Sequence, residues 1–303
     1  MNWKGFFYFL VLAFIIFSSG VMFRKFYTHK SLASPIANFI SKPDKQKNNS
    51  LEDTVLNSLG GTQGTYAVTI KNLKTNESYS VNEHKSFESG SLYKLWIMAT
   101  VYKQIQEGNL SEDQELSDDV TNLNSKFNID PDTAELTDGQ ITLTVKDALT
   151  QMITISHNYA ALLLTEQIKL SSVAAFLKIN GFNESAVGTD QSQPTTTASD
   201  IADFFEKLYK GQLANEQYTK EMVDLLKNQQ LNDGIPKYLP EKTQVAHKTG
   251  DIDNFKHDAG IVFGNHGDYI LTAFSESDMP SAAQERIAQL SKSVYDYYTN
   301  PGK

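Results

Sequence analysis

The chain contains no cysteine, and this absence removes several kinds of chemistry at once. Without thiols there is no structural disulfide, no thiolate nucleophile and no cysteine-rich zinc site. Basic residues are also in deficit, with 27 lysines and arginines against 36 aspartates and glutamates, a formal net charge of -9. Because binding to a phosphate backbone needs a net basic face, we expect no nucleic acid partner.

Histidine is scarce as well, and its spacing does not match that of zinc enzymes. The chain has 6 histidines, and neither an H-E-x-x-H nor an H-x-x-E-H pattern occurs. His247, His257 and Asp258 are close in sequence, but an alternating strand accounts for them as isolated side chains. We therefore expect no metal ion and no cofactor.

One long uncharged apolar run is present near the start of the chain, Phe6–Phe23, with Lys4 before it and Arg24 and Lys25 after it. Its length is near the lower limit for a membrane-spanning helix. No cysteine follows, so a lipoprotein anchor is excluded. We expect an uncleaved transmembrane anchor, and a secretory signal cleaved near Ser18–Gly20 is the alternative.

The rest of the chain divides into a linker and a folded part. Residues 24–50 are polar and contain Pro35 and Pro43, which is typical of a tether. A hydrophobic content of 40% and a charged content of 21% are ordinary for a globular protein. We expect one folded domain over residues 51–303, with an α/β lobe at about 51–88 and 235–303 and a helical lobe at about 89–234.

The periodicity of apolar residues predicts an α+β fold. Period-two alternation predicts strands, and a period near 3.6 predicts helices. The expected strands are Thr65–Lys71, Ser78–Val81, Gln244–Lys248, Ala259–Phe263 and Tyr269–Phe274. The expected helices are a short one from Leu51, then Leu92–Glu107, Val145–Ile155, Tyr159–Ile168, Ser172–Ile179, Ser199–Tyr209, Gln217–Leu226 and Ala282–Tyr298. Strands at both ends with helices between them predict one antiparallel sheet beside a helical lobe.

A serine and a lysine three residues apart, Ser91 and Lys94, stand at the start of an apolar helix. This spacing puts both side chains on one helix face. A serine hydroxyl needs a base to become a nucleophile, and a lysine with a lowered pKa can be that base. The backbone N–H of Ser91 can form half of an oxyanion hole. Seen alone, the pair would be a capping serine followed by an exposed lysine.

Two further motifs follow in order, Ser156-His157-Asn158 between two helices and Lys248-Thr249-Gly250 at the end of a strand. Lys248 can place positive charge near a substrate carboxylate and near Ser156, and Thr249 can offer that carboxylate a hydroxyl. Gly250 allows close approach, where a larger side chain would block the substrate.

Together the three motifs resemble those of the penicillin-recognising serine hydrolases, most closely the class A β-lactamases. The resemblance runs from about Leu51 to the C-terminus. It implies a β-lactamase/transpeptidase-like fold, an antiparallel sheet flanked by helices plus a mainly helical lobe. It also implies that Ser156 relays a proton to the leaving group, that Asn158 orients the substrate amide, and that the backbone N–H of Asp251 completes the oxyanion hole.

The chain departs from the class A pattern in two places. The middle position of the second motif is usually aspartate and here is His157, which bears on local packing. Class A enzymes also carry a glutamate in an E-x-x-L-N pattern on an Ω-loop, and no such pattern occurs between Gly181 and Ala198. Glu184 and Asp190 are the nearest carboxylates that could replace this base for deacylation.

Three readings of function stay open from the sequence. The first is a β-lactamase-like hydrolase that forms an acyl-enzyme on Ser91. The second is a D-alanyl-D-alanine peptidase or transpeptidase acting on peptidoglycan stem peptides, and the third is a β-lactam-binding sensor without turnover. We expect a monomer outside the cytoplasm, anchored or secreted, although the excess of positive charge after the apolar run favours the opposite orientation.

Overall fold

The computed structural model describes residues 50–188 and 192–300. The predicted membrane segment Phe6–Phe23, most of the linker and Asp190 lie outside the described residues. In the described part of the chain, no single helix is long and apolar enough to cross a membrane. One pair of consecutive helices, bent by 83°, reaches the required length and composition together.

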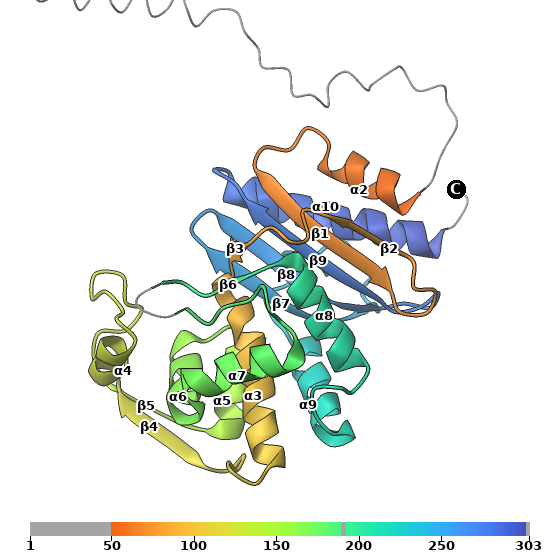
Figure 1. The fold of residues 1–303 in the computed structure, drawn as a ribbon. Coiled ribbons are helices and arrows are strands. Elements are labelled where there is room, and N and C mark those ends of the chain that lie inside the picture. Colours follow the sequence, from red (N-terminus) through yellow and green to blue (C-terminus); the bar gives the residue numbers. More distant parts are fainter. Residues whose placement is uncertain (1–49, 189–191, 301–303) are drawn as a thin grey trace, which may run out of the picture. The chain divides into compact units, whose positions relative to one another are not determined.

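The centre of the fold is a five-stranded sheet in the order β2-β1-β9-β8-β7 (Figure 1). Every neighbouring pair in it is antiparallel. The strands are β1 (Thr65–Asn72), β2 (Ser78–Val81), β7 (Gln244–Ile252), β8 (Phe255–Phe263) and β9 (Tyr269–Glu276). The first hairpin therefore joins the last three strands in one sheet, as the sequence predicts. Strand β7 is left at an edge.

Two helices cover one face of this sheet, α2 (Leu51–Leu59) and α10 (Pro280–Thr299), which lie side by side in Figure 1. Their buried side chains share an apolar cluster with alternate residues of the strands, because successive side chains of a strand point to opposite faces. On β9, for example, Leu271 and Ala273 belong to this cluster together with Val55 and Ile287.

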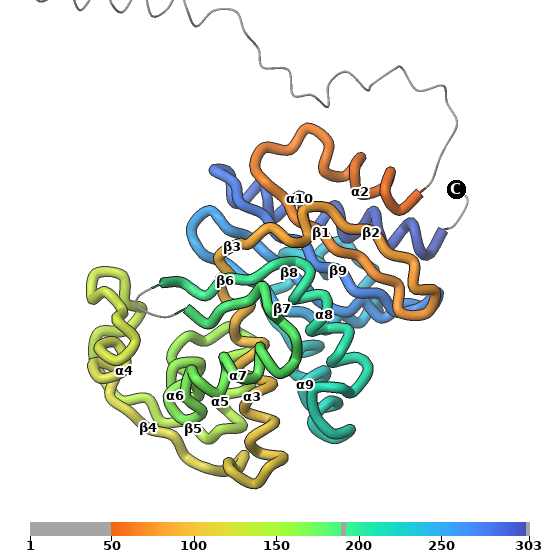
Figure 2. Tube along the Cα trace, viewed as in Figure 1, coloured from red at the N-terminus to blue at the C-terminus, as the bar shows by residue number. Residues whose placement is uncertain are grey.

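The other face meets a second, larger cluster formed with the helical part of the chain (Figure 2). Helix α8 lies against β1, β8 and β9, and Ile270 and Phe274 of β9 pack toward this side. Helix α3 contacts α5, α6, α7 and α9, and its residues 94–102 are all buried. The bounds are α3 (Lys94–Gln106), α5 (Val145–Thr154), α6 (Asn158–Ile168), α7 (Leu170–Asn180), α8 (Ala198–Tyr209) and α9 (Glu216–Lys227).

The structure adds short elements that the sequence patterns did not indicate. These are helix α4 (Val120–Lys126), the hairpin of β4 (Glu115–Asp119) and β5 (Gln140–Thr144), and a ladder of β3 (Phe87–Glu88) with β6 (Thr195–Thr196). Strand β4 is mostly exposed and rich in acidic residues, and β3 and β6 hold two residues each. Strands so short or so polar carry no readable period-two signal.

The third motif lies inside a strand rather than at its end, which corrects the sequence prediction. Strand β7 was expected to end at Lys248, and in the structure it continues to Ile252. Register pairs Thr249 with Asp258 and Asp251 with Lys256. The second half of β7 contains polar residues and shows no apolar alternation, so the sequence pattern did not predict it. This half is a strand because it pairs with β8.

Gly250 allows the close approach of the edge strand that the sequence predicts, and the expected effect of a larger side chain on substrate stays a prediction. A Cβ on Gly250 would lie 2.6 Å from the carbonyl oxygen of Ser89 and 3.0 Å from Leu92 Cγ. Both contacts belong to the segment that carries Ser91. Glycine therefore lets the edge strand lie directly against the segment of the expected nucleophile.

Side chains at the helix starts accept hydrogen bonds from free backbone N–H groups. Thr197 caps α8 by accepting from the N–H of Asp200 at 3.1 Å. His157 caps α6, because its Nδ1 accepts from the N–H of Ala160 at 3.1 Å. The imidazole thus performs the capping that a short carboxylate at this position would perform.

We predict that replacing His157 by alanine lowers the free energy of unfolding by about 1 kcal/mol, because the cap of α6 is lost. His157→Asp should keep the protein as stable as the wild type, since a carboxylate is a good cap. Urea denaturation of the full chain measures both. Alanine at the exposed His266 is the control, and equal losses for the two alanine variants would contradict the capping role.

We predict that Gly250→Ala destabilises the fold by about 1–3 kcal/mol, because its Cβ would overlap backbone. Gly60→Ala is the matched control, since a Cβ there meets atoms no nearer than 3.4 Å. Thermal unfolding of the two variants beside the wild type gives the comparison. A melting temperature for Gly250→Ala as high as that of the control would show that the strand has room to move.

Candidate active site

Ser91 lies in a short 3-10 helix, η2 (Gly90–Tyr93), which runs directly into α3. Lys94 is the first residue of α3, and its side chain has no exposed surface, whereas Ser91 is partly exposed. A buried lysine is rare unless its nitrogen has hydrogen-bond partners. The positions of these partners define the site.

The Lys94 amine contacts two residues of the second motif. Nζ lies 2.5 Å from the carbonyl oxygen of Ser156, 2.6 Å from Asn158 Oδ1 and 3.2 Å from Ser156 Oγ. The two shorter contacts are N–H groups donated to carbonyl oxygens. A neutral amine that donates both of its protons in this way keeps one lone pair, which can take a proton from a hydroxyl.

Ser156 stands between α5 and α6 in a left-handed backbone conformation, with φ of +59°. A residue other than glycine is uncommon in this region of φ and ψ, which costs about 1 kcal/mol or more. In this conformation the carbonyl oxygen of Ser156 contacts Lys94 while its hydroxyl contacts Lys248, with 3.0 Å between Lys248 Nζ and Oγ. One serine therefore joins two lysines.

Both lysines of the site are completely buried, and burial penalises their charged forms. The pKa of Lys94 is lowered well below its ordinary value, first by burial and then by the charge of Lys248, and Glu135 opposes this shift. Burial also lowers the pKa of Lys248 to about 7, against an opposing effect of Asp258. Lys94 is therefore suited to act as a neutral base near neutral pH, with Lys248 still partly charged.

The edge strand β7 brings the third motif beside the Ser91 segment. Lys248 Nζ also donates to the carbonyl oxygen of Thr249 at 3.0 Å. Gly90 has φ of +48°, and a Cβ on it would lie 2.8 Å from the backbone nitrogen of Asp251. The Asp251 carboxylate is paired with Lys256, so this residue faces the site with its backbone. The backbone of Asp251 thus lies beside the Ser91 segment, and the role of the two N–H groups as oxyanion donors stays a prediction.

Asn158 has contacts at both ends of its side-chain amide. Its Oδ1 accepts from Lys94, and its Nδ2 donates to Glu135 Oε1 at 2.6 Å. Glu135 belongs to the loop between α4 and β5, and no motif in the sequence pointed to it. Only the folding of that loop onto α6 brings its carboxylate to the site.

Glu184, one of the two carboxylates considered for deacylation, contacts other groups. It lies 3.1 Å from His84 Nδ1 and accepts a hydrogen bond from Thr197 at 2.9 Å. Its hydrogen bonds within the described residues do not include Ser91 or Lys94, and its role in deacylation stays a prediction. Asp190 lies outside the described residues.

The two histidines near the third motif have structural partners. His257 is buried among Phe87, Phe255 and Phe274, and its Nε2 donates to the carbonyl oxygen of Glu88 at 2.8 Å. Burial lowers its pKa to about 4, so the ring is neutral.

His247 lies between two oxygen atoms, 2.8 Å from Asp258 Oδ1 and 3.0 Å from Asn232 Oδ1. Asp258 also accepts from the N–H of Ile235 at 2.7 Å, which ties the segment before β7 to the sheet. Within residues 50–188 and 192–300 no group of three or more histidine and acidic side chains could hold a metal ion.

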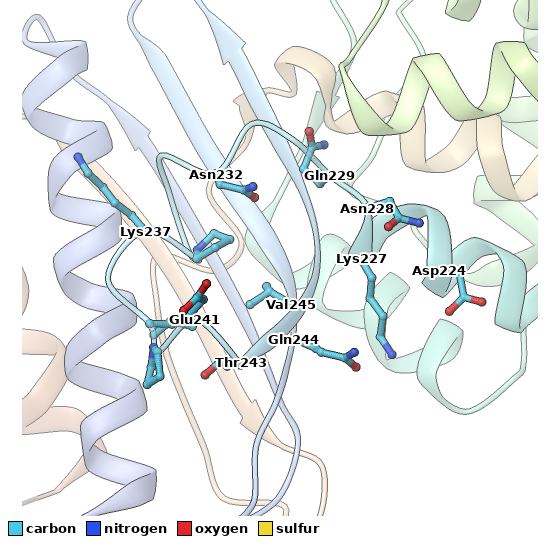
Figure 3. A pocket seen from close by; sticks show the side chains of 13 residues that line it. Asp224, Lys227, Asn228, Gln229, Asn232, Lys237, Glu241, Thr243, Gln244 and Val245 are labelled. Atoms are coloured by element: carbon cyan, nitrogen blue, oxygen red, sulfur yellow. The ribbon is translucent and has the colours of Figure 1, made fainter.

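A hollow of about 890 Å³ lies beside the start of β7 and contains none of the motif residues (Figure 3). It is bounded by the end of α9, the segment after it and the first residues of β7, and polar side chains such as Asp224, Asn232 and Gln244 line it. The hollow is thus separate from the lysines and serines described above, which lie where β7 meets η2 and α6.

The structure brings the predicted site residues together. Direct contacts join Lys94, Ser156, Asn158 and Lys248. Ser91 lies in η2, three residues before Lys94, and β7 carries Thr249, Gly250 and Asp251 against this segment. Sequence patterns missed Glu135, and they assigned His157 to local packing without indicating its capping bond.

Comparison with solved structures shows the same fold in known proteins. A β-lactamase from Sphaerobacter thermophilus superimposes with a TM-score of 0.71 at 22% identity, covering 82% of this chain and 96% of that one. PBP-A gives a TM-score of 0.73 at 21% identity, covering 84% and 97%. At these identities the similarity concerns the fold.

Comparison of sequences goes further. The β-lactamase VEB-1 of Pseudomonas aeruginosa is 26% identical over 258 residues, which are 77% of this chain and 85% of that protein. The model of the β-lactamase enzyme family matches residues 50–298, nearly the whole of the described part. A match of this extent, on a chain whose fold and motif geometry agree with it, shows that the protein belongs to the β-lactamase enzyme family.

Proposed function

We propose that this β-lactamase-type hydrolase acts through a covalent acyl-enzyme on Ser91, with β-lactams as its substrates. The observation that supports this most is the Ser156 hydroxyl, which two buried lysines contact at 3.2 and 3.0 Å. Two lysine amines without exposed surface are costly to fold. Such an arrangement is typical of an acid–base site.

The first step is attack on the lactam carbonyl. Neutral Lys94 takes the proton of the Ser91 hydroxyl while Oγ forms a bond to the carbonyl carbon. The carbonyl oxygen becomes negative and is stabilised by the backbone N–H groups of Ser91 and Asp251. Loss of one such donor typically reduces the rate by about 100- to 1000-fold.

The second step breaks the C–N bond of the lactam. The Ser156 hydroxyl gives its proton to the leaving nitrogen, and protonated Lys94 restores that proton. Positive charge on Lys248 and the hydroxyl of Thr249 hold the carboxylate of the substrate during both steps. The two steps thus assign roles to five motif residues, Ser91, Lys94, Ser156, Lys248 and Thr249.

Release of the acyl group needs water and a base, and this stage supports a second candidate function. The Glu184 carboxylate contacts His84 and Thr197, so we do not assign it as the base that activates water. Without such a base the acyl-enzyme would be long-lived. One similar solved structure is a PBP-A variant in an acyl-enzyme complex with penicillin G. The second candidate is therefore a D-alanyl-D-alanine peptidase or transpeptidase of peptidoglycan stem peptides, or a sensor that stays acylated. For any of these substrates we place the domain outside the cytoplasmic membrane.

We predict that a fluorescent penicillin labels the full-length chain and that Ser91→Ala abolishes the label, a loss of more than about 1000-fold in rate. Ser293→Ala on the exposed side of α10 is the control and should be labelled like the wild type. Gel fluorescence against time gives the rate. Equal labelling of Ser91→Ala and the control would exclude Ser91 as the nucleophile.

A chromogenic cephalosporin separates the candidates after acylation. Steady hydrolysis supports a β-lactamase. A label that persists without turnover, together with release of D-alanine from a model stem peptide, supports the peptidase.

We predict a bell-shaped pH dependence of acylation. The rate should rise with pH as Lys94 loses its proton, and fall above about pH 7 as Lys248 loses the charge that binds the substrate carboxylate. In Lys248→Arg the arginine stays charged, so the alkaline fall should move to higher pH even if the rate is lower. Labelling rates between pH 5 and pH 9 test this. An alkaline fall at the same pH in Lys248→Arg would contradict the role of Lys248.

A further inference from the structure

A line of short hydrogen bonds runs from an exposed loop to the buried base. Glu135 Oε1 accepts from Asn158 Nδ2 at 2.6 Å, and Asn158 Oδ1 accepts from Lys94 Nζ at 2.6 Å. A side-chain amide has one oxygen and one nitrogen, so it can be held in two orientations. The Glu135 carboxylate only accepts hydrogen bonds, and it therefore selects the orientation in which the amide oxygen faces Lys94.

The loop that carries Glu135 is held in place by buried groups. The next residue, Leu136, donates its N–H to the Tyr159 hydroxyl at 3.2 Å. The carbonyl oxygen of Leu136 accepts from Asn124 Nδ2 at 2.8 Å, and the Tyr159 hydroxyl lies 2.9 Å from Asn124 Oδ1. Tyr159 is 2% exposed and directly follows Asn158 in the chain. Glu135 is thus fixed beside Asn158 by backbone contacts and not by its own side chain alone.

We propose that Glu135 is a positioning residue of the acylation site: its carboxylate orients the Asn158 amide, which in turn holds the Lys94 amine against Ser156. This inference rests on the proposed function, because the step that it tunes is acylation by Ser91. It also assigns a role to a carboxylate outside the three motifs and outside the loop between Gly181 and Ala198.

The charges that surround Lys94 strengthen this inference. Lys248 faces Lys94 from β7, Glu135 faces it from the loop before β5, and the Tyr93 ring lies 5.9 Å from Nζ at the start of α3. Lys248 lowers the pKa of Lys94, and Glu135 is the acidic group that raises it. Removing the charge of Glu135 should therefore lower the pKa of Lys94 further.

The first test compares acylation rates of Glu135→Ala, Glu135→Gln and Asp132→Asn in the full-length chain. Asp132 is an exposed carboxylate of the same loop and serves as the control. Glutamine still offers an oxygen acceptor, so Glu135→Gln should keep most of the rate at its own pH optimum. Its acid limb should move to lower pH, because Lys94 then becomes neutral at lower pH. Glu135→Ala should lose about tenfold or more at every pH, because the amide is no longer oriented.

The second test does not depend on activity. Lysine labelled with ¹³C at Cε lets NMR follow the protonation of Lys94, with the signal assigned by its absence in Lys94→Arg. In Glu135→Gln the Lys94 signal should titrate at lower pH than in the wild type and in Asp132→Asn. If the penicillin labels none of the proteins, the proposed function fails, while this titration still decides the role of Glu135.

Any one of three results would overturn the inference. The first is a Lys94 titration that is the same in Glu135→Gln and in Asp132→Asn. The second is an acylation rate of Glu135→Ala equal to that of Asp132→Asn, with thermal unfolding confirming that both variants are folded. A Glu135→Gln variant as slow as Glu135→Ala would likewise show that the acceptor oxygen does not orient the amide.

Discussion

The site depends on the burial of two lysine amines around one serine hydroxyl. Lys94 and Lys248 have no exposed surface, and each contacts Ser156 Oγ. Burial disfavours the charge on each lysine, and the nearness of the two disfavours charging both. A proton near Ser156 is consequently held weakly, which suits the proton transfers of the proposed acylation. The contacts of Asn158, the backbone of Ser156 and the approach of β7 all serve to hold these amines in place.

The fold supports this arrangement from two sides. On one side, the helical part of the chain presents the start of α3 and the turn between α5 and α6, so that Lys94 meets Ser156 and Asn158. On the other side, β7 lies against η2 because Gly250 has no side chain to keep it away from Ser89. The buried His247–Asp258 pair and its bond to Ile235 fasten the segment before β7 to the sheet. A side chain at position 250 would push β7 away from η2, and we expect this to increase the distance between Lys248 and Ser156.

Much of this site could be predicted from the sequence, and the parts that could not be predicted have physical reasons. The S-x-x-K spacing is a local property of a helix, so the position of Lys94 beside Ser91 followed from it directly. The apolar periods likewise indicated the helices and the five-stranded sheet. Glu135 could not be found in this way, because its loop has no periodic signal and reaches Asn158 only through Tyr159 and Asn124. The close approach at Gly250 was expected, but the identity of its neighbour Ser89 was not, since the two residues are remote in sequence.

The sequence by itself determined the candidates for the reacting groups, the α+β class and the absence of thiol chemistry, because these depend on residue type and local spacing. Tertiary structure alone decided which oxygen atoms surround Lys94, why its pKa falls, and that Glu184 pairs with His84 rather than with the site. Charge, burial and hydrogen bonding act through distances in space. Lys94 and Lys248 are far apart in the chain, and they acquire their chemistry only when the fold has brought both amines within about 3 Å of the Ser156 hydroxyl.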